Sequence, residues 1–417
     1  MKSRLIVSLL SIAAFMALSL LLTGTSAQAA GTVVGIGSAA SCNEAALTAA
    51  VAAGGPISFN CGSSKMTITL TKELVIGVDA SLDSLGLVTI SGGGKTRVMH
   101  VKPGIHLDLS KITLADGKAS DTPGSGGDLW NEGGIVNLLD TTVDNGAADH
   151  NGADILSQGG TLTLGRVTLS NGKASGDGGA LYIEKSKALL SNVTVSTNSA
   201  TGHGGGLVNF GGTVDLINVT LYKNTAPADG TDIYNADAAP AGAGTGPATE
   251  SAQAPQNAVI TVKNTIIAND KPKDPPTTPI LNCKDVTTGG NAGKNIVDGG
   301  KNLQYPDNSC GDNIVMANPK LAILGNYGHY SKTHALLAGS PAINTAEETV
   351  CEQDPVGRLD ERNVRRPFGS ICDIGAYEYV IIPPTATPVP PTQVPAPHQP
   401  PPGKKGPAPT ATLAIPR

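Results

Sequence analysis

The chain has 417 residues, of which 52 are glycine and only 3% are aromatic, an unusual composition for a domain with one thick core. A chain of this length normally divides into several cores unless it forms one elongated array, and the glycine content favours the array, while collagen is excluded because glycine does not recur at every third position. The net charge of −5, without any basic stripe, excludes nucleic acid as the expected partner.

Residues 1–30 have the pattern of a signal peptide. Lys2 and Arg4 precede an apolar run, and Ala27-Gln28-Ala29 fits a cleavage site. An uncleaved membrane anchor is the alternative, because the run approaches the ~18 residues that a span needs. The sequence predicts a protein that is secreted or held at the cell surface, with no transmembrane span in the mature chain.

Residues 31–65 are predicted to form an N-terminal cap, with a helix over 43–53 that places Leu47 and Val51 on one face. Export puts the cysteines in an oxidising compartment, and their even number predicts disulfides between nearest neighbours. Zinc is the competing interpretation, but no C-x-x-C spacing supports it. The six cysteines are Cys42, Cys61, Cys283, Cys310, Cys351 and Cys372.

Residues 66–270 are predicted to form a repetitive β-structure. Between 129 and 232 the chain divides into blocks of 26 residues, each opened by a glycine-rich triplet and built from alternating apolar and polar residues. This alternation predicts short strands, and blocks too small to bury their own apolar face must stack on one another. The expected fold is an all-β, single-stranded parallel β-helix. The blocks begin at Leu129, Ile155, Leu181, Leu207 and Ile233.

One turn of each block carries an asparagine at nearly the same phase: Asn145, Asn171, Asn198 and Asn224. Stacked asparagine side chains hydrogen-bond along such an array, so we interpret the four as a structural ladder. Downstream, residues 259–267 repeat the pattern of residues 214–221, but the two stretches are separated by more than one 26-residue period. The additional residues fall in an Ala/Gly/Pro-rich stretch, 236–256, which is predicted to be a loop.

Residues 271–382 lack the period and are predicted to cap the far end of the solenoid, which would otherwise expose strand edges. A dense charge group at 354–366 is interpreted as ion pairs that organise this region. The tail 383–417 contains 13 prolines and is predicted to be a disordered stalk.

Several motifs carry a resemblance to known families. GGALY (178–182) and GGGLVN (204–209) resemble the GGA-type repeats of polymorphic outer-membrane proteins and other right-handed β-helices, and CNEAAL (42–47) is loosely similar to a CSLREA-type N-terminus. The C-terminal region, roughly 270–380, resembles the choice-of-anchor Q domain of bacterial exported β-helix proteins, with Asn344 and Asn363 as departures. The motifs of that region are NPKL (318–321), NYG (326–328), THALL (333–337), GSPAIN (339–344), DERN (360–363), RP (366–367) and CDIGAYE (372–378). The resemblance implies a right-handed solenoid at a bacterial surface and supplies no catalytic residue.

β-Helices also include polysaccharide lyases, which need a basic residue to abstract a proton and acids that hold Ca²⁺. The weak catalytic candidates are Arg166, Asp140, Asp149 and Asp154, and the weak Ca²⁺ candidates are Asp144, Asp149 and Asp154. Local turn chemistry and an Arg166–Asp140 pair are the competing interpretation, which we favour. Apart from this Ca²⁺ hypothesis, no cofactor is predicted.

The sequence therefore predicts a monomeric, exported right-handed parallel β-helix. We expect an adhesin-like binding or structural module that contacts extracellular glycans or cell-surface components. The alternative is a polysaccharide lyase or hydrolase with a pectate-lyase-like fold. No platform for stacking sugars is recognisable, because Tyr182, Phe210 and Tyr222 stand alone in the sequence.

Overall fold

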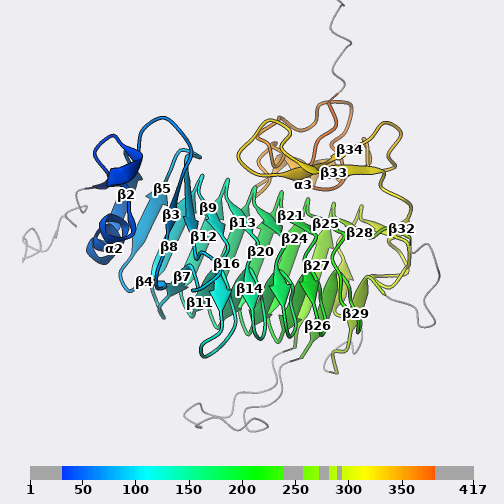
Figure 1. Cartoon of the computed structure of the whole chain (residues 1–417). Coiled ribbons are helices and arrows are strands. Elements are labelled where there is room, and N and C mark those ends of the chain that lie inside the picture. Colours follow the sequence, from blue (N-terminus) through cyan, green and yellow to red (C-terminus); the bar gives the residue numbers. More distant parts are fainter. Residues whose placement is uncertain (1–30, 238–256, 272–280, 289–293, 381–417) are drawn as a thin grey trace, which may run out of the picture. The chain divides into compact units, whose positions relative to one another are not determined.

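The computed structural model describes residues 31–237, 257–271, 281–288 and 294–380. Within them the chain winds into a single-stranded right-handed parallel β-helix, as predicted (Figure 1). The predicted signal peptide 1–30, nearly all of the predicted loop 236–256 and the predicted tail 383–417 lie outside the described residues.

Two long parallel sheets form two of the walls. Sheet A contains β1 (Thr32–Val34), β2 (Gly55–Phe59), β5 (Ala80–Asp83), β8 (His106–Ser110), β12 (Ile135–Leu139), β16 (Thr161–Gly165), β20 (Lys187–Ser191), β24 (Thr213–Ile217), β27 (Val259–Lys263) and β30 (Ile296–Asp298). Sheet B contains β3 (Met66–Thr69), β6 (Val88–Ser91), β9 (Thr113–Ala115), β13 (Thr142–Asp144), β17 (Thr168–Ser170), β21 (Thr194–Ser196), β25 (Thr220–Tyr222), β28 (Ile266–Ala268), β31 (Leu303–Tyr305) and β32 (Val315–Met316).

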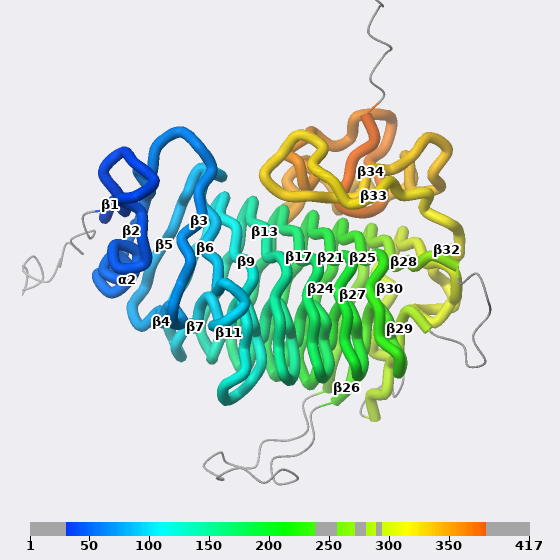
Figure 2. Tube along the Cα trace, viewed as in Figure 1, coloured from blue at the N-terminus to red at the C-terminus, as the bar shows by residue number. Residues whose placement is uncertain are grey.

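Two further parallel sheets complete the coil. Sheet C contains β4 (Leu74–Ile76), β7 (Met99–Val101), β11 (Leu129–Glu132), β15 (Ile155–Gln158), β19 (Leu181–Glu184), β23 (Leu207–Phe210), β26 (Ile233–Ala236) and β29 (Cys283–Asp285). Sheet D contains β10 (Lys118–Ala119), β14 (Ala147–Ala148), β18 (Lys173–Ala174) and β22 (Ser199–Ala200). A regular coil visits sheets C, A, B and D in turn, and Figure 2 shows these coils stacked along one axis.

The 26-residue period predicted the register of the central coils. Leu129 pairs with Ile155, Ile155 with Leu181, Leu181 with Leu207, and Leu207 with Ile233. These residues open the strands of sheet C and lie in the core. Alternation along each strand therefore stacks like side chains inside the coil and leaves the intervening ones on its outer faces.

The corner between sheets A and B holds a column of residues with positive φ, including Asp140, Arg166, Asn192, Asn218 and Asn264. Asparagine and aspartate tolerate this left-handed conformation better than most residues, because their short side chains bond locally. Asn192, Asn218 and Asn264 are also buried. Arg166 is one of the residues in this column, so the backbone of the corner determines its position.

The N-terminal end is closed by a helix, α2 (Glu44–Ala53), which follows the 3₁₀ turn η1 (Ala39–Ser41). Asn43 caps α2, because its side chain accepts a hydrogen bond from the N–H of Ala46 at 3.1 Å. Leu47 and Val51 of α2 are buried in the core. The strands of 31–65 also belong to the β-helix, since β1 and β2 pair within sheet A.

Three disulfides join nearest neighbours in the sequence: Cys42–Cys61, Cys283–Cys310 and Cys351–Cys372. The pairing is the one predicted. The second bridge lies in the last described coils and ties β29 to the chain that follows β31. Among the described residues, no helix is long and apolar enough to cross a membrane.

The solenoid continues beyond the predicted boundary at residue 270, because β29, β30, β31 and β32 extend its sheets. The chain after β32, residues 317–379, is here called the C-terminal segment. It contains the antiparallel pair β33 (Leu321–Gly325) and β34 (Thr333–Leu336) and the short helix α3 (Glu348–Glu352). The segment was predicted as an end cap, but its hydrogen bonds to β17, β21 and β25 place it along the outer face of sheet B (Figure 1).

Candidate functional site

Arg166, the candidate base, is engaged with a buried acid. Its Nε and Nη2 donate to Oδ1 and Oδ2 of Asp140 at 2.6 and 3.0 Å, and the Asp140 side chain is only 4% exposed. His329 of the C-terminal segment lies over the pair, with Nε2 3.6 Å from Asp140 Oδ1. The guanidinium therefore neutralises Asp140 and is not directed at a substrate.

Replacing Arg166 with alanine is expected to destabilise the fold, because it leaves the Asp140 carboxylate buried without its cation. Breaking such a pair costs about 3–5 kcal/mol. Urea unfolding followed by circular dichroism measures this loss, and Lys173→Ala, at an exposed position of sheet D, is the matched control. A variant with unchanged stability but lost activity on polyuronides would instead identify Arg166 as a catalytic base.

The three Ca²⁺ candidates face different surroundings. Asp154 is wholly buried, and its Oδ1 accepts a hydrogen bond from the N–H of Gly146 at 3.2 Å. Asp144 accepts from Ser170 at 2.8 Å on the outer face of sheet B, whereas Asp149 is exposed. Across the part of the chain that the structure describes, no group of three or more His, Cys, Asp or Glu residues is placed to hold a metal ion.

Burial, rather than a metal, dominates the electrostatics of Asp154. Asp128 occupies the preceding position of the same column and accepts from the N–H of Gly117 at 2.8 Å. Burial raises the pKa of both carboxyls well above the ordinary value, and the proximity of the two acids raises it further for Asp154. Burial therefore favours the protonated form of both side chains.

The four asparagines predicted as one ladder occupy two adjacent columns. Asn145 and Asn171 have positive φ at the corner between sheets B and D. Asn198 and Asn224 are displaced by one position and buried, with a hydrogen bond of 3.0 Å between Nδ2 of Asn198 and Oδ1 of Asn224. Thr197 takes the corner position instead, with a φ of 61°.

The C-terminal segment covers part of sheet B through a dense polar interface. Glu361 is fully buried, and its two carboxyl oxygens lie 3.1 Å from Thr168 Oγ1 and 2.5 Å from Thr194 Oγ1. On the next strand, the hydroxyl of Thr220 accepts a hydrogen bond from the N–H of Ala376. The outward threonines of β17, β21 and β25 in sheet B therefore form hydrogen bonds with the C-terminal segment of the same chain.

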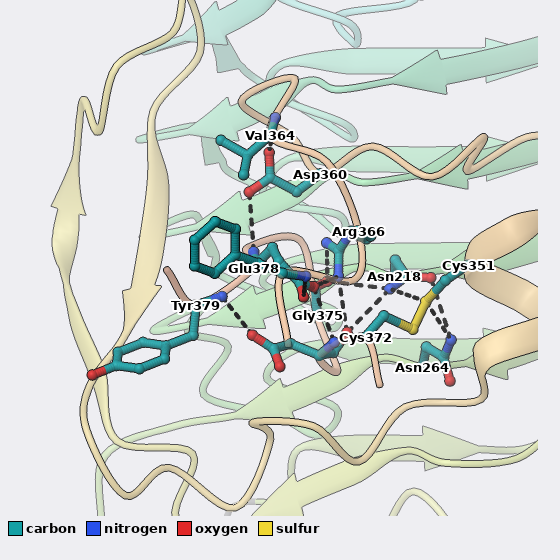
Figure 3. Close-up of polar contacts among 12 residues, drawn as sticks. Asn218, Asn264, Cys351, Asp360, Val364, Arg366, Cys372, Gly375, Glu378 and Tyr379 are labelled. Carbon is teal, nitrogen blue, oxygen red and sulfur yellow. Dashed lines mark hydrogen bonds and ion pairs between the residues drawn. A yellow bond between two sulfur atoms is a disulfide. The ribbon is translucent and has the colours of Figure 1, made fainter. Parts of the chain in front are cut away.

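The interior of the segment is organised by a buried arginine (Figure 3). Arg366 donates to the carbonyls of Leu359, Asp373 and Gly375 and to Oε2 of Glu378. The segment is anchored to the A–B corner as well, because Nδ2 of the corner asparagines contacts it. Asn218 donates to Asp373 O at 3.3 Å, and Asn264 donates to Glu347 O at 3.1 Å.

The contacts of Arg366 and its neighbours agree with the prediction that the charge group at 354–366 forms ion pairs that organise this region. Nε and Nη2 of Arg362 both donate to Oδ2 of Asp360, at 2.9 and 2.6 Å, and the same oxygen accepts from the N–H of Glu378. These ion pairs hold the loops of the segment together. Glu361 is the exception, since its side chain leaves the group and enters sheet B.

A second group of charged side chains surrounds Trp130 on the outer face of sheet C. The register of β7 and β11 pairs His100 with Trp130, and their rings stack with centroids 3.8 Å apart. The guanidinium of Arg97 lies 5.1 Å from the centroid of the Trp130 ring, and the ammonium of Lys102 lies 5.9 Å away. We call these residues, with Glu73 and Glu132, the Trp130 cluster.

Two glutamates flank the imidazole of His100. Glu132 Oε2 lies 3.0 Å from Nε2, and Glu73 Oε1 lies 3.6 Å from Nδ1. The hydrogen bond with His100, with a further contribution from Arg97, lowers the pKa of Glu73 to about 2. Partial burial opposes ionisation of Glu132, but its hydrogen bonds with Lys102 and His100 prevail and lower its pKa.

The Trp130 cluster remains accessible at its rim. The side chains of Lys102 and Glu132 are 44% and 35% exposed, although His100 beneath them is 4% exposed. The cluster thus presents an ammonium and carboxylates around an aromatic ring that is held in place from below. Such a surface offers hydrogen-bond donors and acceptors at fixed positions.

Sequence reasoning missed this cluster because its coil departs from the 26-residue period. Trp130 pairs with His100, a separation of 30 residues. The sequence contained one local signal. His100 and Lys102, like Trp130 and Glu132, are two positions apart and stand shortly before a glycine, so both pairs are expected on the same face of their strands. The tyrosines that stood alone in the sequence also have partners, for example Tyr222, whose ring packs edge-on against His334.

Comparison with known proteins adds little to this geometry. No protein-family model and no curated protein matches the chain, so the resemblance to choice-of-anchor Q proteins stays a prediction. Among solved structures, the crystal structure of pectate lyase Pel9A is similar, with 13% sequence identity over 79% of this chain and 90% of that chain. Its TM-score is 0.37, and a likeness at this level carries no information on activity.

Proposed function

We propose that the protein is an exported, adhesin-like binding module, secreted or displayed at the cell surface, that contacts extracellular glycans through the Trp130 cluster. The predicted signal peptide and the three disulfides support an extracellular location. The observation that carries the proposal is the contrast between two faces. Sheet B is partly covered by the C-terminal segment, whereas the cluster on sheet C has an open charged rim.

The chemistry of the cluster suits a polyhydroxylated ligand. Sugar hydroxyls both donate and accept hydrogen bonds, and Glu132 and Lys102 provide an acceptor and a donor side by side. The underlying His100 fixes the Trp130 ring and reduces the entropy lost on binding.

The lyase alternative has less support from the geometry of the described residues. Its base, Arg166, is paired with Asp140, and its acids Asp149 and Asp154 lie in an exposed and a buried environment respectively. A lyase would need the acids to converge on one substrate group. A binding module needs only the surface that sheet C provides.

The test uses Trp130, the single tryptophan of the sequence, as an intrinsic reporter. Titrating the full chain with neutral and acidic polysaccharides is expected to change the Trp130 fluorescence on binding one of them. Glu132→Gln and Lys102→Ala are each expected to weaken that binding about tenfold, the effect of losing about 1.4 kcal/mol. Absorbance of unsaturated products is recorded on the same samples.

Lys187→Ala is the control, because Lys187 is exposed on the outer face of sheet A. The proposal is wrong if a glycan binds with equal affinity to the chain and to both cluster variants, or if no polysaccharide binds. Release of unsaturated product would replace it with the lyase alternative.

A further inference from the structure

The outer face of sheet B carries a column of threonines. The register aligns Thr67, Thr89, Thr113, Thr142, Thr168, Thr194 and Thr220 on successive strands from β3 to β25. Thr67 is exposed, whereas Thr168, Thr194 and Thr220 are buried under the C-terminal segment. The segment therefore rests on one part of this hydroxyl column, and the column becomes exposed only toward Thr67 at its far end.

Glu361 enters this column without a cation. Around its carboxyl the structure places hydroxyls: Thr168 of β17, Thr194 of β21 and Thr333 of β34. Within the described residues it forms no ion pair. Two charged residues of this part of the segment are engaged elsewhere. Asp360 pairs with Arg362, and Lys332, whose backbone N–H donates to Thr168, pairs with Asp144 at 3.4 Å.

Two histidines of the segment also lie at this interface: His329 beside Asp140, whose pKa is lowered by burial, and His334 on β34. His334 is in contact with sheet B. Its Nδ1–H donates to the carbonyl of Ala322 on β33, so Nε2 faces the Ser196 hydroxyl of β21 at 2.8 Å. The ring packs edge-on against Tyr222 of β25, and the charges that act on it from a distance are Lys223 and Asp270. Burial lowers the pKa of His334 to about 4, and the imidazole is neutral when docked.

We propose that the C-terminal segment is a pH-gated latch: it docks on sheet B with Glu361 neutral, and ionisation of Glu361 releases it and uncovers the threonine column. A carboxylate in this position would have only hydroxyl donors and no counter-charge, in a site without water access. Hydroxyl hydrogen bonds do not replace the solvation that a charge loses on burial. Once released, the same carboxyl is hydrated.

The direction of the pH effect follows from linkage. Burial raises the pKa of Glu361 well above its ordinary 4.5, so docking loses strength as pH rises above that value. The lowered pKa of His334 has the opposite consequence, because docking weakens as pH falls below 6.5. The two effects offset each other between these values. Above them the effect of Glu361 prevails, and the ratio of released to docked segment rises with pH until the docked carboxyl itself ionises.

The test measures how often sheet B is uncovered. All six native cysteines are in disulfides, so Thr220→Cys introduces a single free thiol under the segment. Its labelling rate is divided by that of Thr213→Cys, at an exposed position of sheet A, to correct for ionisation of the thiol itself. Between about pH 7 and pH 9 this ratio is expected to rise with pH, by at most about tenfold per unit. With Glu361→Gln added, it is expected to stay constant.

Ser170→Cys provides a second probe of the same face, in case Thr220→Cys disturbs docking through the lost hydrogen bond to Ala376. Circular dichroism at each pH confirms that the β-helix stays folded. An equal rise with and without Glu361→Gln, or a ratio that does not change with pH in either background, overturns the latch. Glycan binding at the Trp130 cluster is measured on another face, so it succeeds or fails independently.

Discussion

Replacing Arg366 with alanine is expected to destabilise the C-terminal segment by about 3–5 kcal/mol, the cost of removing one partner from a buried charged network. Arg366 has no exposed surface, and its guanidinium satisfies three carbonyls and Oε2 of Glu378. Alanine leaves these acceptors in a dry site without donors. Hydrogen exchange at the Glu361 amide, which donates to Ala376 O within the segment, should accelerate at least about a hundredfold.

Arg365→Ala is the matched control for this prediction. Arg365 is the preceding residue, has the same side chain and is exposed. Its replacement is expected to change stability by less than about 0.5 kcal/mol. Equal effects of the two substitutions would show that the hydrogen bonds of Arg366 do not hold the segment together.

The free energy of unfolding is expected to be largest near the ordinary aspartate pKa of about 4 and to fall as pH rises above it. Burial raises the pKa of Asp128, Asp154 and Asp232 in the β-helix well above that of an unfolded aspartate. Raised values stabilise the fold below the unfolded pKa, and this stability is lost as pH rises through the folded value. Each carboxyl contributes a decline of about 1.4 kcal/mol per pH unit over the range in which it is protonated in the fold and ionised in the unfolded chain.

The acid side of this profile has a separate cause. The lowered pKa of Glu73, about 2, stabilises the fold above the ordinary glutamate value, and this contribution is lost as pH falls from about 4.5. Urea unfolding across the pH range measures both limbs. Asp128→Asn should flatten the alkaline limb, because asparagine still accepts from the N–H of Gly117 and releases no proton. Asp149→Asn, at an exposed position, should leave the profile unchanged.

The sequence was sufficient to predict the β-helix because one physical signal repeats along it. Apolar alternation with a 26-residue period determines both the strands and their register, as the pairing of Leu129 with Ile155 shows. The disulfides followed from their spacing. Helix α2 followed from the placement of Leu47 and Val51 on one face.

The features that the sequence did not predict depend on contacts between distant residues. Glu361 follows Asp360 in a charged stretch, and nothing local distinguishes the carboxyl that enters sheet B from the one that pairs with Arg362. The outward threonines Thr168 and Thr194 resemble ordinary exposed strand residues until the C-terminal segment covers them. The Trp130 cluster on sheet C was not predicted for a different reason. The separation between His100 and Trp130 is longer than the 26-residue period, so a search with that period does not align the two residues.

The route of the chain between β26 and β27 shows how this architecture absorbs changes in length. Residues 237–258 separate the two strands, yet Ile217 still pairs with Lys263 as though the coils were of equal length. Near the two ends of this stretch, Asp237 accepts a hydrogen bond from the N–H of Ala258 at 2.9 Å. A gene that encodes such an array can gain or lose codons at this corner without altering any neighbouring coil. The corner is therefore a natural place to graft a foreign epitope or a reporter domain.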